Sequence, residues 1–135
     1  MRQPVEVASS LDERRQLAVA TAERRLRAEW RDLVGAVFSY GAIDLAFRHL
    51  VVWVLLTGPP EAIPAWAFPP SDGSPWNLDD LATPEQRNLL PTLTGMAAVV
   101  RECLCEAGWP EFEHVSVGFD AVDRVEENGG WAYFK

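Results

Sequence analysis

The stretch VSVGFDA, residues 115–121, decides the fold class, because the period of the apolar residues changes there. Alternate positions are apolar and the positions between them are polar or small, which predicts a strand with one buried face. The apolar patterns before it recur at three and four residues, which predicts helices. Helices first and strands last indicate an α+β fold, mostly helical, with the strands laid over one side or end of a helical core.

The segment after this stretch has two interpretations. Asn128-Gly129-Gly130 is typical of a tight turn, and an Asn-Gly loop would pair Val125 with Ala132 in a C-terminal β-hairpin. In the alternative, residues 121–127 form a short helix with Asp120 as its N-cap. We favour the hairpin.

On the other side of the stretch, Thr83 and Pro84 are typical of a helix start, as the N-cap and the first helical residue. Apolar residues then recur with helical spacing as far as Gly108, where this third helix is expected to end. Pro91 lies inside it, so we expect either a kink or a restart near Thr92.

The first helix is long and amphipathic. An S-x-x-E pattern at Ser10–Glu13 is typical of a capping box, and the spacing that follows predicts a helix over residues 11–38. Residues 1–9 are expected to be a flexible N-terminus, and residues 10–135 a single α+β domain.

The second helix is predicted over residues 42–56, after a break at Ser39-Tyr40-Gly41. This segment is apolar nearly all round, as a buried helix is, and Gly58-Pro59-Pro60 is expected to end it. About three helices are therefore predicted in all.

Residues 57–80 join the second and third helices as a long loop rich in proline and tryptophan. Five prolines in residues 59–70 exclude a helix or a central strand. Since exposing Trp66 and Phe68 to water is costly, we expect both to pack into the helical core. In the alternative, some of the rings of Trp66, Phe68 and Trp76 face outward, as anchors for a partner or as a lid over a pocket.

Charge is divided unequally along the chain. The net charge is −8, of which residues 1–50 carry +1 and residues 51–135 carry −9. Residues 102–127 hold eight acids, with Arg124 as their one basic residue. A strongly acidic surface repels nucleic acid and membrane and attracts a basic partner. The arginines of the first helix alternate with acids, which indicates a salt-bridged, solvated face rather than a nucleic-acid site.

These features predict protein–protein interaction without catalysis. The protein would bind a basic protein partner and regulate or neutralise it, by analogy with the immunity proteins, antitoxins and inhibitors that are small, acidic and compact. The predicted acidic face consists of Glu111, Glu113, Asp120, Asp123 and Glu126. Trp76 and Trp131 are the candidate aromatic anchors. A homodimer is compatible as well, with the basic first helix of one copy against the acidic tail of another.

Two other functions are open. One is a small-molecule-binding protein or an enzyme, with a pocket under the loop of residues 57–80 near His49. Its predicted lining is Tyr40, Asp44, Arg48, His49 and Trp53. The other is a structural subunit of an oligomer, which would show as an apolar patch too large for a monomer.

Chemistry-bearing motifs are scarce. His49 is expected to be a hydrogen-bonded residue of a buried helix, and Asp44 and Arg48, four residues apart, an ion pair on it. Glu111 and His114 form a single Glu-x-x-His pattern within an expected strand, whereas a di-iron site needs two such pairs. No P-loop, dinucleotide or nucleophile motif is present, and no metal or cofactor is predicted.

The two cysteines and the absence of long apolar segments bear on location. Cys103 and Cys105 lie two residues apart in a predicted helix, so their side chains point about 200° apart and both are expected to be reduced thiols. The longest apolar run, residues 50–56, is far short of the roughly 20 residues of a membrane span. No signal segment is visible, and we expect a soluble, cytoplasmic protein.

Overall fold

The computed structural model describes residues 4–41, 46–70, 83–130 and 133, with side chains from residue 11 onward. Its centre is a three-stranded sheet in the order β1-β2-β3. Strand β1 (Val34–Tyr40) pairs antiparallel with β2 (Val51–Leu56), and β2 pairs parallel with β3 (Ser116–Ala121). The central strand is therefore β2, and its two neighbours run in opposite directions.

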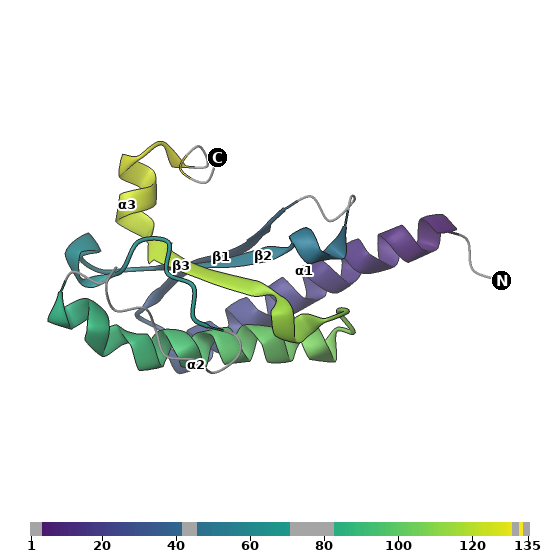
Figure 1. The fold of residues 1–135 in the computed structure, drawn as a ribbon, viewed down its shortest axis with the longest axis horizontal. Coiled ribbons are helices and arrows are strands. Elements are labelled where there is room, and N and C mark those ends of the chain that lie inside the picture. The colour runs from purple at the N-terminus through teal and green to yellow at the C-terminus, as the bar shows by residue number, and fades with distance from the viewer. Residues whose placement is uncertain (1–3, 42–45, 71–82, 131–132, 134–135) are drawn as a thin grey trace.

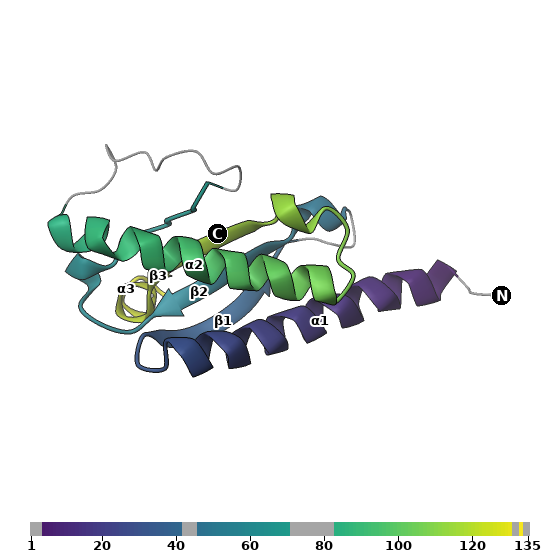
Figure 2. The ribbon, with the colours of Figure 1, turned by 90° about the horizontal axis from the view of Figure 1, so that it is seen from below.

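Two long helices cover one face of this sheet. Helices α1 (Pro4–Glu29) and α2 (Pro84–Glu106) lie side by side beneath the strands, and the first turns of α1 extend beyond the end of the sheet (Figures 1 and 2). The short helix α3 (Val122–Glu127) stands on the opposite side (Figure 1). The predicted α+β class is confirmed, with the sheet as a full layer rather than a terminal hairpin.

Helix α2 is the predicted element that the structure reproduces most closely. The Thr83 side chain accepts a hydrogen bond from the backbone N–H of Gln86, and Pro84 follows as the first helical residue. The helix runs as one element from Pro84 to Glu106 with Pro91 inside it. Local signals at both ends of a helix place it well because capping requires only neighbouring residues.

The predicted first helix is wrong at both ends. Helix α1 begins at Pro4 and passes through Ser10, so Ser10–Glu13 is not a capping box, and it ends at Glu29. Residues 34–40 form strand β1 instead, with a register shift between Val34 and Ala36. This bulge places Val34 and Val37 on the same buried face at a spacing of three, which imitates a helical period. The flexibility of residues 1–9 stays a prediction.

The predicted second helix is also wrong. Residues 51–56 are strand β2, and residues 47–49 form a single 3₁₀ turn, η1 (Phe47–His49). Residues 42–45 lie outside the described residues. A central strand covered on both faces is apolar throughout, and its period cannot be told from that of a buried helix.

The C-terminal hairpin is wrong too, although its first strand is confirmed as β3. Residues 122–127 are helical, so Val125 does not pair across a turn. The helical alternative is right in kind, but the N-cap is Ala121 rather than Asp120. Ala132 lies outside the described residues. Strand β3 pairs instead with β2, more than fifty residues earlier in the chain.

Alternation along the strands produces two apolar layers. One face of the sheet packs on α1 and α2 and forms the main core, whose strand residues include Val52, Val54, Val117 and Phe119. On the opposite face, Trp53 and Leu55 of β2 pack with Val125 of α3 in a second, smaller cluster. None of the helices in the described residues has both the length and the apolar character that a bilayer span needs.

Candidate functional site

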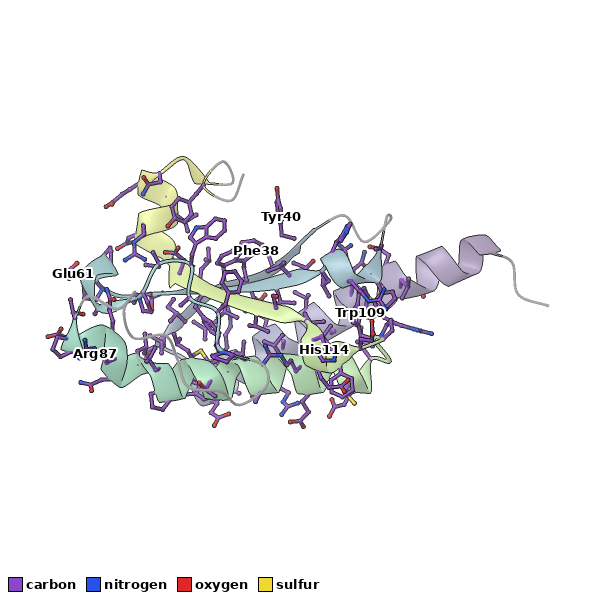
Figure 3. The ribbon with its side chains drawn as sticks, viewed as in Figure 1. Phe38, Tyr40, Glu61, Arg87, Trp109 and His114 are labelled. Atoms are coloured by element: carbon purple, nitrogen blue, oxygen red, sulfur yellow. The ribbon has the colours of Figure 1, made fainter. Side chains whose placement is uncertain are left out.

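The face of the sheet turned away from α1 and α2 carries a group of aromatic rings, which we call the aromatic face. Strand β1 contributes two rings, β2 one, the segment after β2 two, and the segment after α3 one. These residues are Phe38, Tyr40, Trp53, Trp66, Phe68 and Tyr133. Three of the rings are largely accessible to solvent: the exposed fraction is 45 % for Trp66 and 39 % for both Phe68 and Tyr40. Figure 3 shows Phe38 and Tyr40 on this side of the sheet.

Edge-on contacts join the rings around Trp53. The Trp53 ring centroid lies 5.2 Å from that of Trp66 and 5.2 Å from that of Phe68, and both pairs are T-shaped. Trp66 also lies 6.3 Å from Tyr133. These are favourable geometries for aromatic pairs, so the rings support one another although half of the cluster is exposed.

Gly118 on β3 makes room for this arrangement. A Cβ at this position would lie 2.7 Å from the Phe68 ring and 2.8 Å from the Trp53 ring, closer than real contacts allow. The absence of a side chain therefore leaves room for both rings next to β3. In the sequence, this glycine appeared only as a small residue in an alternating strand.

The segment that carries Trp66 and Phe68 is fixed to the outer edge of β3. Ala67 exchanges two backbone hydrogen bonds with Phe119, of 2.9 and 2.8 Å. Ala67 is buried, but Trp66 and Phe68 do not enter the helical core, because the sheet separates them from the helices. The expectation that they do was wrong, and the alternative that rings of this loop face outward agrees with their exposure.

Trp66 has a backbone conformation that bulky residues rarely adopt. Its φ is +48°, in the left-handed region, which costs about 1–3 kcal/mol for a residue other than glycine. The Trp66 backbone N–H donates to Oδ2 of Asp120 at 3.1 Å. The fold therefore maintains a strained backbone at a position where it presents an exposed indole.

Asp120 is the anchor for this conformation. The side chain is fully buried, and it accepts hydrogen bonds from Arg124 Nη1 at 2.6 Å and from the Tyr133 hydroxyl at 2.9 Å, besides the bond from Trp66. Arg124 in turn donates to the backbone oxygens of Ile63, at 2.7 Å, and Pro60. Burial, and then the hydrogen bond to Asp120, raise the pKa of Tyr133 to about 12.

The prediction that Asp120 belongs to an exposed acidic face is therefore wrong. A buried carboxylate must be compensated by donors, and here a half-buried guanidinium, a hydroxyl and backbone N–H groups supply them. The spacing of four between Asp120 and Arg124 was a usable signal, but only if residues 121–127 are helical.

The remaining predicted acidic residues divide into two groups. Glu111 forms a two-point ion pair with Arg48, at 2.8 and 3.3 Å. Glu113, Asp123 and Glu126 are exposed, and within the described part of the chain they form no ion pair. The predicted anchors Trp76 and Trp131 lie outside the described residues.

The predicted pocket under the loop does not form from the described residues. Trp53 belongs to the aromatic face, whereas His49 and Arg48 lie on η1. His49 is exposed rather than buried in a helix, and Asp44 lies outside the described residues. Tyr40 is exposed on the aromatic face.

A cavity of about 300 Å³ lies instead at the end of the sheet where β2 and β3 begin. The turns η1 and η4 (Phe112–His114) border it, and its lining includes Arg48, Glu111 and His114. Glu111 and His114 thus lie on a tight turn rather than in the expected strand. Among the described residues, no group of three His, Cys, Asp or Glu side chains is placed to hold a metal ion.

The two cysteines are free thiols that lie in different environments. Cys103 is buried, whereas Cys105 is exposed rather than buried or half-buried as expected. The Cys103 sulfur accepts a 3.6 Å hydrogen bond from Arg25, and burial raises the pKa of this thiol. A raised pKa disfavours the reactive thiolate, so Cys103 acts as a packing residue.

Comparison with protein-family models, with curated proteins and with solved structures finds no match for this chain. The described geometry is then the basis for assigning a function. Two places stand out in it: the aromatic face supported by Asp120, and the cavity between η1 and η4. Among the described residues, Trp66 and Glu111 are the two other than glycine with a positive φ, and each of these places contains one of them.

Proposed function

We propose that this protein is a non-catalytic interaction module that binds a basic protein partner through the aromatic face, and so regulates or neutralises it. The observation that carries the proposal is Trp66: an exposed indole held in a strained conformation by a buried carboxylate. Strain of this kind collects at functional positions, since folding alone gives no reason to keep it.

The composition of the aromatic face supports this function. Tryptophan and tyrosine are the residues that most often carry binding energy at protein interfaces, and Trp66 and Tyr40 are both accessible here. The rings are fixed by contacts with Trp53 and by the bridge at Ala67, so little conformational entropy is lost when a partner binds.

The charge of the protein indicates the kind of partner. Helix α3 adjoins the aromatic face, because Val122 and Val125 pack in the same cluster as Trp53. Its exposed acids Asp123 and Glu126 therefore lie at the border of this face. Acidic groups at the border of an apolar patch attract and orient a basic protein.

The experiment compares two variants of the immobilised protein in an extract of the host organism. Trp66→Gly removes the indole and also relieves the positive φ, so the variant is expected to fold. We expect it to lose about 30-fold or more in affinity for a basic protein that the wild type retains. Leu17→Ala is the control, because Leu17 is an exposed apolar residue on α1, on the other side of the molecule.

Mass spectrometry of the retained proteins and measurement of their affinities give the result. Support requires a basic protein that binds to the wild type and to Leu17→Ala but not to Trp66→Gly. Retention of the same proteins by Trp66→Gly would contradict the proposal, and so would a retained set without a basic protein.

A further inference from the structure

The cavity between η1 and η4 has the composition of a small-molecule site. Its volume of about 300 Å³ is at the small end of the range for such sites. Apolar walls come from Phe47, Trp109, Pro110 and Val115. Figure 3 shows Trp109 and His114 together at this end of the molecule, far from Glu61 and Arg87 at the other end.

Arg48 is held by Glu111 through only some of its N–H groups. Its Nε and Nη2 atoms donate to Glu111, and its guanidinium carbon lies 4.9 Å from the centroid of the Phe47 ring. Within the described residues, Nη1 donates no hydrogen bond. A guanidinium fixed at one edge and stacked on a ring presents its remaining N–H groups in a defined direction, which suits a carboxylate.

Two further features distinguish the lining from ordinary surface. Trp109 is 2 % exposed, and its indole N–H is buried without a partner among the described residues. An unpaired buried donor is unfavourable and is satisfied by an acceptor. Glu111, which holds Arg48, has a φ of +51°, a conformation that is costly for a residue other than glycine.

Nitrogen-bearing side chains lie around the cavity, together with the acids Glu111 and Glu113 at η4. Both histidines of the chain, His49 and His114, lie on the turns that border it. Arg101 donates to the backbone oxygen of Val115, which lines the cavity, at 3.1 Å. Hydrogen-bond donors for a carboxylate are therefore present at this end of the molecule, where Glu111 balances the charge of Arg48.

We propose that this cavity binds a small carboxylic acid with a flat apolar body, of about the size of an arylacetate. Its carboxylate would bind the free N–H groups of Arg48, and its ring would pack between Phe47 and Trp109. The proposal does not depend on the function of the aromatic face, because none of the residues that line the cavity belongs to that face.

Phenylacetate is the probe, and ¹H–¹⁵N NMR of the full chain is the measurement. The indole N–H signal of Trp109 is assigned by its loss in Trp109→Phe. We expect phenylacetate to shift this signal and to saturate with a Kd on the order of 1 mM or tighter. Phenylacetamide, which has the same shape without the charge, is expected to bind at least tenfold more weakly.

Arg48→Gln tests the residue on which the proposal depends, and Arg87→Gln is its matched control. Arg87 is exposed at the opposite end of the molecule, so both variants lose one exposed positive charge (Figure 3). We expect Arg48→Gln to weaken phenylacetate binding at least tenfold, with signals away from the cavity unchanged, and Arg87→Gln to bind as the wild type does.

Three results would overturn the proposal. They are the absence of any shift at cavity residues up to about 10 mM phenylacetate, equal binding of phenylacetamide, and unchanged binding by Arg48→Gln.

Discussion

Asp120 has a role that its surroundings in the sequence conceal. It lies in an acidic stretch, and acids in such stretches are usually on the surface. In the structure it is fully buried, and it connects α3, Tyr133 and Trp66 through charge-assisted hydrogen bonds. One residue thus determines both local stability and the conformation of the exposed indole.

Replacing Asp120 should destabilise the fold strongly. Asp120→Asn leaves the half-buried Arg124 without its counter-ion, and breaking a buried ion pair costs about 3 kcal/mol in the free energy of unfolding. Asp123→Asn is the control, since Asp123 is three residues away and exposed. It should change the free energy of unfolding by less than about 0.5 kcal/mol. Urea denaturation measures both, and equal effects of the two substitutions would exclude the structural role of Asp120.

Tyr133 predicts how stability depends on alkaline pH. Its pKa is raised from 10.0 to about 12 in the folded protein, so the folded state holds the phenolic proton more tightly than the unfolded state does. The resulting stability is fully present below pH 10 and is lost as pH rises toward 12.

The test is a series of urea denaturation curves between pH 9 and pH 12. Tyr133→Phe should remove part of the loss of stability over this interval, whereas Tyr40→Phe, at the exposed tyrosine, should leave it unchanged. If the curves of Tyr133→Phe and the wild type stay parallel, the hydroxyl does not have the environment described here.

At the scale of elements, the capping signals of α2 were reliable, whereas the S-x-x-E pattern at Ser10–Glu13 and the turn signal at Asn128-Gly129 were not. Helix α2 was predictable because Thr83 and Pro84 act on neighbouring N–H groups. Strand β1 was missed because a bulge shifts its alternation, and β2 because both of its faces are covered. The parallel pairing of β2 with β3 has no local signature, since the two strands are joined through α2.

For the candidate sites, the sequence indicated single residues but not which of them lie together. Exposed rings in the loop after β2 were among the alternatives that the sequence left open, and Arg48 and Glu111 were both named, but in separate sites. Their pairing depends on the approach of η1 to η4, which are more than sixty residues apart. The support of Trp66 by Asp120 likewise joins segments that no sequence period connects.

Alanine substitution of two glycines in different elements should change the free energy of unfolding in opposite directions. Gly118→Ala places a methyl group within 2.8 Å of the Trp53 ring, and overpacking of this kind costs about 1 kcal/mol or more. Gly95→Ala in α2 meets the Trp30 ring at 3.7 Å, an ordinary contact, and should stabilise by about 0.5–1 kcal/mol through helix propensity.

Thermal and urea unfolding compare the two variants, and tryptophan fluorescence reports the displacement of the Trp53 ring in Gly118→Ala. A Gly118→Ala variant as stable as the wild type, with unchanged fluorescence, would show that the aromatic face tolerates a side chain beneath it.

At the scale of the whole molecule, part of the acidic character is balanced internally. Arg25 of α1 pairs with Glu102 at 3.4 Å and with Glu106 at 4.0 Å, and Glu111 pairs with Arg48. Helix α1 therefore already forms ion pairs with acids of the same molecule. This weakens the argument for a homodimer in which α1 of one copy attracts the acidic tail of another. The exposed acids of α3 keep their charge available for a partner.

If a basic partner associates through these acids, the rate should depend on salt. Raising the ionic strength from about 0.01 to 0.15 M shortens the screening length from about 30 to 8 Å and should slow association about tenfold or more. Asp123→Arg and Glu126→Arg, each made alone, should slow association at low salt, while Glu85→Arg at the start of α2 changes the charge by the same amount and serves as the control. Stopped-flow association with the partner is the measurement, and a rate independent of salt would rule out steering.

The parallel strand β3 also has a consequence for synthesis of the chain on the ribosome. Residues 51–56 are made early, but the strand that covers their open side is completed only at residue 121. Until then the apolar segment VVWVLL has an unpaired edge, which is a template for aggregation. The interval between the synthesis of residue 56 and that of residue 121 is therefore the one in which a nascent chain most needs protection by a chaperone.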